Sequence, residues 1–144
     1  MSIRNPEKLR KLLTQNRLKK RALELSIQWR VHGVQVSTVA HDRYWKLIDR
    51  LGGGRSWPLK YVEDLSAEMH AFVGTTDLMT VIGWIVEEEP PLLISSEALL
   101  RTTHVIKTIY ADGFILINDE SGHALLVDID EHEGIHAAVI ELPS

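Results

Sequence analysis

The chain has 144 residues, of which 44% are hydrophobic and 25% charged, with a formal net charge of −4 at pH 7. This length suits one domain with its own core, and the ordinary charged content argues against wholesale disorder. The absence of cysteine excludes a disulfide scaffold, a thiolate nucleophile, an iron–sulfur cluster and a cysteine-ligated zinc site. No apolar run approaches the roughly 18–20 residues of a membrane span, and no secretory signal is evident, so we expect a cytoplasmic protein.

The first thirty residues predict a long helix. Asn5-Pro6 has the residue types of a helix start, because asparagine is a good N-cap and proline is favoured at the first helical position. Apolar residues then recur every three or four positions and Gly33 is a suitable stop, so we expect an amphipathic helix over roughly 6–31. Its apolar face would contain Leu18, Ala22, Leu25 and Trp29.

Two further helices are predicted on either side of a glycine run. The first covers about 40–51 and ends at Gly52-Gly53-Gly54, which is also a candidate hinge. Trp57-Pro58 predicts extended chain, because the residue before proline avoids the helical region. The next helix covers about 59–72, and its apolar set is Tyr61, Val62, Leu65, Met69 and Phe72.

Strand patterns begin in the middle of the chain. The apolar run 78–86 has the length and the β-branched content of a buried strand, and 92–94 suits a short strand. Ser95 or Ser96 can cap a short helix that extends through Leu100.

The last third predicts an antiparallel meander. The segment 104–110, before the meander, alternates loosely between apolar and polar residues and ends at Asp112-Gly113. The apolar runs 114–117 and 124–129 flank a polar loop with a glycine, which is a hairpin signal. The segment 135–142 can supply the final strand.

Helices therefore come first and strands second, which is the α+β class, with N-terminal helices packed on a C-terminal, mainly antiparallel sheet. We expect a single domain over 1–144, with a helical part at about 1–74 and a sheet part at about 75–144. Charge is divided in a similar way: residues 1–60 have fourteen Lys/Arg against four Asp/Glu, whereas residues 61–144 have two against sixteen. We expect the two parts to pack together and partly neutralise each other, although either could also meet a charged partner.

The first predicted helix is strongly basic. Such a helix can contact phosphates, with binding that weakens as salt increases. Few aromatic side chains are placed to stack on bases, however, and no helix-turn-helix, RNA-recognition or zinc-finger pattern occurs. We therefore interpret the basic residues as the solvated face of a core helix. A nucleic-acid-binding accessory role is the alternative, and we expect no membrane partner. The basic residues are Lys8, Arg10, Lys11, Arg17, Lys19, Lys20, Arg21 and Arg30.

The segment His132-Glu133-Gly134-Ile135-His136 satisfies the H-E-x-x-H pattern. On a helix, the two histidines can bind zinc while the glutamate activates water. The pentapeptide resembles that of zincin proteases, but Gly134 interrupts it and no suitably spaced third ligand follows. A zinc-dependent hydrolase using His132, Glu133 and His136 is therefore the alternative to a turn and an edge strand with solvent-facing histidines.

Other catalytic patterns are missing. The triple glycine lacks the lysine and Ser/Thr spacing of a P-loop, there is no G-x-S-x-G, and the acidic residues lack the ligand order of an EF-hand. We predict no catalytic residues and no cofactor.

Two groups of acidic residues each follow a predicted strand: Glu87–Glu89 after the first, and Asp128–Glu133 at the end of another. A sheet can bring both groups to one rim, and such a rim suits a basic partner, for example a nuclease whose active face binds phosphates. The predicted partner-binding residues are Glu87, Glu88, Glu89, Asp128, Asp130, Glu131 and Glu133.

The segment at about 79–130, which includes VIGWIVEEEPPLLISSEALL and DGFILINDESGHALLVDID, resembles small bacterial immunity proteins. A strand bearing tryptophan, a short helix and a closing hairpin occur in both. The resemblance is to immunity proteins of contact-dependent growth inhibition and polymorphic toxin systems. It implies a binding protein that neutralises a cognate toxin by occluding its active site, and it does not assign binding residues.

Overall fold

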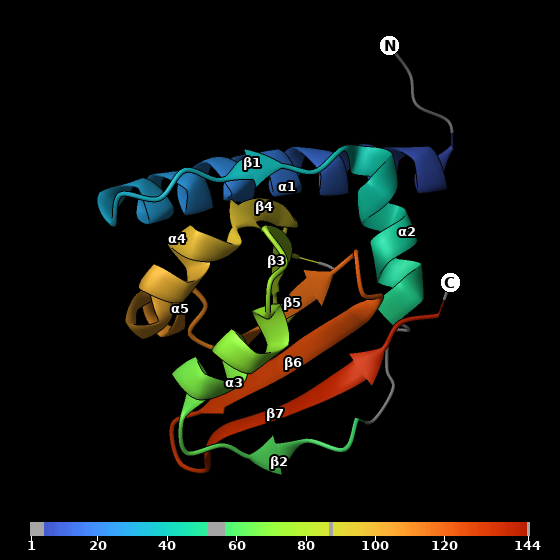
Figure 1. Cartoon of the computed structure of the whole chain (residues 1–144). Coiled ribbons are helices and arrows are strands. Elements are labelled where there is room, and N and C mark those ends of the chain that lie inside the picture. Colours follow the sequence, from blue (N-terminus) through green and yellow to red (C-terminus); the bar gives the residue numbers. More distant parts are fainter. Residues whose placement is uncertain (1–4, 52–56, 87, 144) are drawn as a thin grey trace.

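A computed structural model describes residues 5–51, 57–86 and 88–143 (Figure 1). It has the expected α+β architecture: a seven-stranded, wholly antiparallel sheet with helices packed on both of its faces. The strand order is β1-β4-β3-β5-β6-β7-β2.

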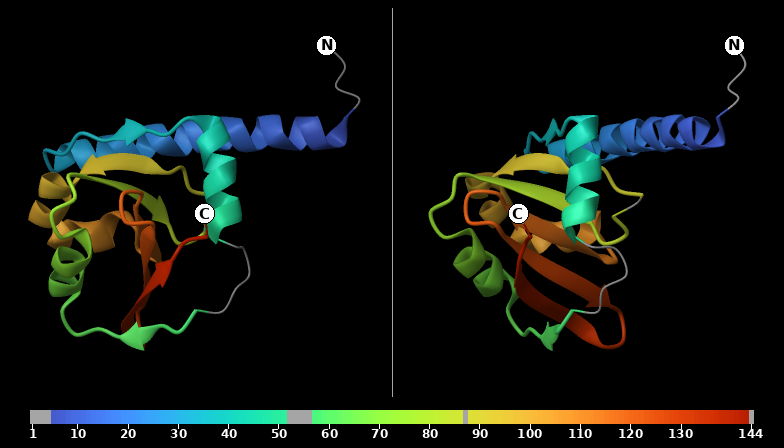
Figure 2. Two further views of the ribbon diagram at one scale, coloured as in Figure 1. Left: turned by 45° about the vertical axis from the view of Figure 1, so that its right-hand side comes forward. Right: turned by 90° about the vertical axis from the view of Figure 1, so that its right-hand side faces the viewer.

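Helix α1 (Pro6–Val31) has the predicted boundaries. The Asn5 side chain accepts hydrogen bonds from the backbone N–H groups of Glu7, at 3.0 Å, and Lys8, at 3.4 Å, which satisfies two free donors of the first turn. The helix lies along one side of the molecule (Figures 1 and 2), and its buried face contains Thr14, Leu18, Ala22, Leu25 and Trp29. Among the described helices, none is both long enough and apolar enough to cross a bilayer.

Strand β1 (Ser37–Thr38) and helix α2 (His41–Leu51) follow. The helix is close to its predicted range, and its residues Leu47 and Leu51 are buried. Strand β1 was not expected; it forms where two residues pair with β4 at an edge of the sheet. The predicted hinge at 52–54 lies outside the described residues.

The third predicted helix starts too early, at about 59. Residues Lys60–Tyr61 form strand β2 instead, and helix α3 covers Leu65–Val73. Two local features explain the later start. The Val62 N–H donates to the carbonyl of Ile135 at 2.9 Å, which keeps this segment on the sheet, and Asp64 caps α3 by accepting from the Ala67 N–H at 3.0 Å.

Strand β3 (Leu78–Gly83) is shorter than the predicted run 78–86, because the chain turns after Gly83. It pairs with β4 (Leu92–Ser95), and Ser95 caps helix α4 (Ser96–Arg101) by accepting from the Ala98 N–H at 3.1 Å.

Most of the segment 104–110, whose pattern alternates only loosely, is helical. Helix α5 (Thr103–Ile109) buries Val105, Ile106 and Ile109. These positions are one and three residues apart, so they lie on one face of a helix, and this face packs onto the sheet.

The C-terminal meander agrees closely with the prediction. It consists of β5 (Gly113–Asn118), β6 (His123–Asp130) and β7 (Gly134–Glu141). The Asn118 side chain accepts from the Ser121 N–H at 3.1 Å and so closes the hairpin turn between β5 and β6.

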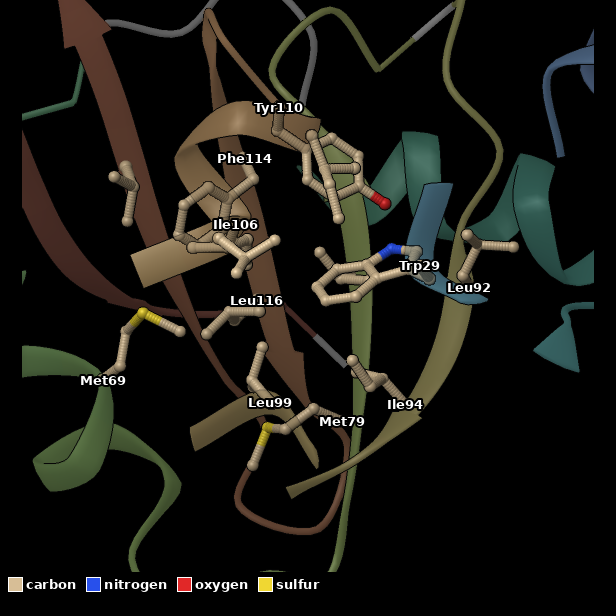
Figure 3. Packing of buried hydrophobic residues seen from close by; sticks show 14 of the residues in the cluster. Trp29, Met69, Met79, Leu92, Ile94, Leu99, Ile106, Tyr110, Phe114 and Leu116 are labelled. Carbon is tan, nitrogen blue, oxygen red and sulfur yellow. The ribbon is translucent and has the colours of Figure 1, made fainter. Parts of the chain in front are cut away.

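Both faces of the sheet are packed against helices. One face, which we call the α5 face, is covered by α3, α4, α5 and the C-terminal part of α1, with Trp29 and Phe114 fully buried among aliphatic side chains (Figure 3). The opposite α2 face carries Ile82, Ile115 and Leu126 and packs against α2 and Leu18 of α1. The two ends of the sheet, together with the part of the α2 face that α2 does not cover, form the polar surface of the sheet.

Candidate functional site

The strand order brings the two acidic groups to the same end of the sheet. Because neighbouring strands are antiparallel, β3 and β6 finish at the end where β5 and β7 begin. The loop after β3 places Glu88 and Glu89 there, and β6 with its following turn contributes four acids (Figure 1). We call this region the acidic end: Glu88, Glu89, Asp112, Asp128, Asp130, Glu131 and Glu133. Glu87, also predicted to bind the partner, lies outside the described residues.

Asp112 links the two acidic groups and was missed in the sequence analysis. It lies in the turn before β5, where its backbone carbonyl accepts from the Ile129 N–H at 3.4 Å. Its negative charge contributes to raising the pKa of both Glu89 and Asp128, after the larger effect of burial in each case. Its position directly before the predicted β5 hairpin strand was the signal that could have found it.

Glu89 is held by the protein itself. Its carboxylate accepts from Arg21 Nε of α1 at 3.2 Å, and only 19% of its side chain is exposed. Burial raises the pKa of Glu89, and the Arg21 hydrogen bond and charge oppose that rise. A Cβ atom at Gly83 would lie 2.5 Å from Glu89 Cγ, so the carboxylate chain packs directly on this glycine. Glu89 therefore fixes the loop after β3 and is not a free carboxylate for a partner.

The Arg21–Glu89 pair also joins the basic and acidic parts of the chain, as the sequence led us to expect. A second such pair joins Arg50 of α2 to Asp119 at 3.5 Å. These contacts neutralise only a small part of the acidic surface, and neither of them involves β6 or the turn that follows it.

A row of side chains crosses the α2 face at the acidic end. The Trp84 N–H donates to the carbonyl of Gly113 at 3.1 Å, Gly113 pairs with Asp128, Asp128 with His136, and His136 with Tyr61. Directly opposed residues of antiparallel strands lie on the same face. We call Trp84, Asp128, His136 and Tyr61 the cross-sheet row.

Aromatic rings stand at both ends of this row. Tyr61 is 63% exposed and meets the His136 ring at a centroid distance of 5.8 Å, in an edge-to-face arrangement. Trp84 is partly exposed and meets Trp57 edge-to-face at 6.2 Å. Ile85, beside Trp84, is 49% exposed. An acidic surface with apolar groups at its margin is therefore open to solvent.

The carboxylate of Asp128 is in an unfavourable environment. Burial raises its pKa, the charges of Asp130, Glu133 and Asp112 raise it further, and His136 partly opposes them. A cation arriving beside Asp128 would relieve this repulsion.

Asp130 has a different role, because its side chain holds the turn between β6 and β7. It accepts from the backbone N–H groups of Glu133, at 2.9 Å, and His132, at 2.8 Å, and these bonds lower its pKa. The turn projects Glu131 and Glu133 into solvent.

The H-E-x-x-H segment does not form the helix that zincin chemistry requires. His132 and Glu133 lie in the turn, whereas His136 lies in β7, which pairs with β6 on one side and β2 on the other. Gly134 has a φ of 84°, a conformation that breaks any helix through this segment. Among the described residues, no three His, Asp or Glu side chains are grouped so that they could hold a metal ion.

The chain matches no protein-family model, no curated protein and no solved structure. Its function has therefore to be argued from the geometry and charge of the acidic end.

Proposed function

We propose that this protein is a stoichiometric inhibitor that binds a basic protein, and that its partner is a cognate bacterial toxin, a nuclease by class. The observation that carries the proposal is the acidic end, where the charges of Asp112, Asp130 and Glu133 act on Asp128 and exposed aromatic and aliphatic groups lie alongside. None of these three carboxylates forms an ion pair within the described part of the chain. The resemblance of residues 79–130 to bacterial immunity proteins supports the same class of function.

The proposed mechanism is occlusion of a phosphate-binding face. A nuclease presents lysine and arginine side chains to the phosphates of its substrate. Asp128, Glu131 and Glu133 would meet those cations, and the inhibitor would then fill the space that the nucleic acid occupies. Because Asp128 is repelled by its acidic neighbours, a cation at this position gains attraction without displacing an existing ion pair.

Charge and packing have separate roles in this proposal. The exposed carboxylates would steer the partner and raise the association rate, an effect that salt screens. Tyr61, Trp84 and Ile85 would be the buried anchors that set the lifetime of the complex, since aromatic side chains dominate the energetics of protein interfaces. An arginine of the partner can also stack on either aromatic ring.

The first experiment identifies the partner and then measures its association rate. The tagged full-length chain is purified from its host and co-eluting proteins are identified by mass spectrometry, with a small basic protein in equal amount as the expected result. In stopped-flow mixing with that protein, Glu131→Lys/Glu133→Lys should slow association by roughly tenfold or more and flatten its salt dependence.

A matched double reversal at the opposite end of the sheet provides the control. Glu120→Lys/Glu141→Lys makes the same change in net charge, and both residues are exposed. The association rate of this control should stay within about twofold of that of the parent protein. Its changed charges lie more than one Debye length, which is about 10 Å at 0.1 M salt, from the proposed interface. Equal slowing by both variants would show that only net charge matters and would contradict an interface at the acidic end.

A further inference from the structure

Helix α1 has two apolar faces. The buried face packs on the sheet, and a second set of large aliphatic side chains lies half a turn away on the opposite side of the helix. Four of them are more than half exposed, with Leu13 at 54%, Leu23 at 64%, Ile27 at 52% and Val31 at 76%. We call the full set the outer stripe: Leu9, Leu12, Leu13, Leu23, Ile27 and Val31.

No described element covers the outer stripe. Figures 1 and 2 show α1 along one side of the molecule, with most of the sheet and the other helices on the side of its buried face and the segment of β1 running beside it. Leu23, at the margin of the stripe, borders a hollow that Thr38 and Val39 also line. The N-terminal part of α1 extends past α2, and its first buried residue is Thr14. Of the ten large hydrophobic side chains exposed in the described part of the chain, six belong to the outer stripe. Such concentration on one element marks an interaction surface.

Basic side chains border the stripe on both sides. Lys8, Lys19 and Arg30 are eleven residues apart, close to three helical turns, and so form a line along one margin. Arg10 and Arg17 lie along the other margin by the same helical geometry. All five are exposed. The acids of α1 are Glu7 and Glu24, so the surface around the stripe is strongly positive.

This charge decides between the possible occupants. A second copy of α1 would bring two strongly basic surfaces together, which opposes pairing of the stripes. Nucleic acid offers phosphates but no apolar surface for six aliphatic side chains. An anionic lipid surface offers both, because its headgroups attract lysine and arginine and the region beneath them accepts aliphatic side chains.

In place of the expectation from sequence of no membrane partner, we propose that α1 lies on an anionic membrane surface, with the outer stripe at the boundary of headgroups and acyl chains. The stripe runs from Leu9 to Val31, about 33 Å along a straight helix, with the polar residues Asn16 and Lys20 on the same side between Leu13 and Leu23. A lysine there can extend its charged end to the headgroups, so the helix can lie flat on such a surface. The turn with Glu131 and Glu133 would then point away from the lipid (Figure 1). The proposal concerns a different face from the acidic end and does not depend on the proposed function.

The test measures co-sedimentation of the full chain with vesicles. Vesicles of phosphatidylcholine with phosphatidylglycerol should bind the protein, with binding that weakens as salt is raised, whereas phosphatidylcholine alone should bind it at least tenfold more weakly. Lys8→Gln/Lys19→Gln/Arg30→Gln should weaken binding to the anionic vesicles roughly a hundredfold, since each basic residue near such a surface contributes about a fivefold factor. Leu23→Ser/Ile27→Ser should weaken it tenfold or more through lost burial.

Matched variants away from α1 serve as controls. Leu78→Ser/Val139→Ser replaces two aliphatic residues that are similarly exposed, at 52% and 54%, and Lys46→Gln/Lys60→Gln/Lys107→Gln removes three exposed positive charges. Both should bind anionic vesicles as the parent does, and circular dichroism checks that every variant is folded.

Several results would overturn the proposal. They are the same affinity for neutral and anionic vesicles, no binding to either, and equal losses in the test and control variants. A dimer in sedimentation analysis that Leu23→Ser/Ile27→Ser dissociates would assign the stripe to a second copy instead. The face would be assigned to nucleic acid if the protein bound DNA or RNA in a salt-sensitive way and did not bind vesicles. In that case Lys8→Gln/Lys19→Gln/Arg30→Gln would abolish the nucleic-acid binding.

Discussion

Asp128 combines a cost in stability with a proposed role in binding. Its pKa is raised in the folded protein, so the folded state binds a proton more readily than the unfolded state. Stability from this group is therefore greatest in acid and falls as the pH rises through the raised pKa. At neutral pH the ionised carboxylate weakens the fold.

Asp128→Asn should therefore make the protein slightly more stable at neutral pH, because it removes repulsion from Asp130 and Glu133. The gain should disappear as the solution is acidified below the ordinary aspartate pKa of 3.8, where Asp128 is protonated in both the folded and the unfolded state. Urea unfolding at a series of pH values measures this difference. Glu120→Gln, in the turn between β5 and β6, is the isosteric control and should change little. A clear loss of stability in Asp128→Asn would show that the carboxylate makes a stabilising contact.

The Arg21–Glu89 pair acts at the scale of whole elements, because it ties α1 to the loop between β3 and β4. Both side chains are less than one third exposed, at 30% and 19%, so water screens the pair less than a surface ion pair. Removing the arginine would leave the partly buried carboxylate of Glu89 with no cation beside it.

Arg21→Gln should accordingly destabilise the protein by about 1–3 kcal/mol at neutral pH. The loss should shrink in acid, because Glu89 then takes up a proton and its burial costs less. Arg101→Gln is the matched control: Arg101 is also paired with a glutamate, Glu97, but their side chains are 56% and 90% exposed, so its loss should be near zero. The two variants are compared by urea unfolding, and equal effects would contradict a special role for the buried pair.

The elements that could be predicted from sequence are those whose signals are local. The boundaries of α1 follow from an N-cap, a helical period and a glycine, all within the helix and its flanks. The hairpin of β5 and β6 is similarly specified by two apolar runs and their loop. Strands β1 and β2 have only two residues each and exist because β4 and β7 offer them a pairing edge, which no local pattern encodes.

The same distinction applies to the candidate site. The meeting of the two acidic groups could be predicted, since it depends only on which strand ends each group follows. The cross-sheet row could not, because Tyr61 joins it through the unexpected strand β2 and Trp84 through a backbone bond beyond the end of β3. The H-E-x-x-H pattern misled because a pentapeptide does not determine whether it lies on a helix or across a turn.

At the scale of the whole molecule, β7 is the strand that completes the sheet. It forms eight residue pairs with β6 and is the only strand partner of β2 among the described residues. A chain that ends at Asp130 should therefore lose cooperative unfolding in urea, because β6 would keep a neighbour on one side only. A sigmoidal transition like that of the full chain would show that the remaining five strands form a stable core of their own.

The pairing of Tyr61 with His136 also has a consequence for timing during synthesis. These residues are about half the chain length apart, so Tyr61 is made early but reaches its place only when the last strand emerges from the ribosome. Trp84 and Asp128 likewise share a surface with His136 only after β7 has been made and has paired with β6. A growing chain therefore presents its carboxylates before the cross-sheet row is complete, and the row is finished only when β7 has paired with β6 and β2.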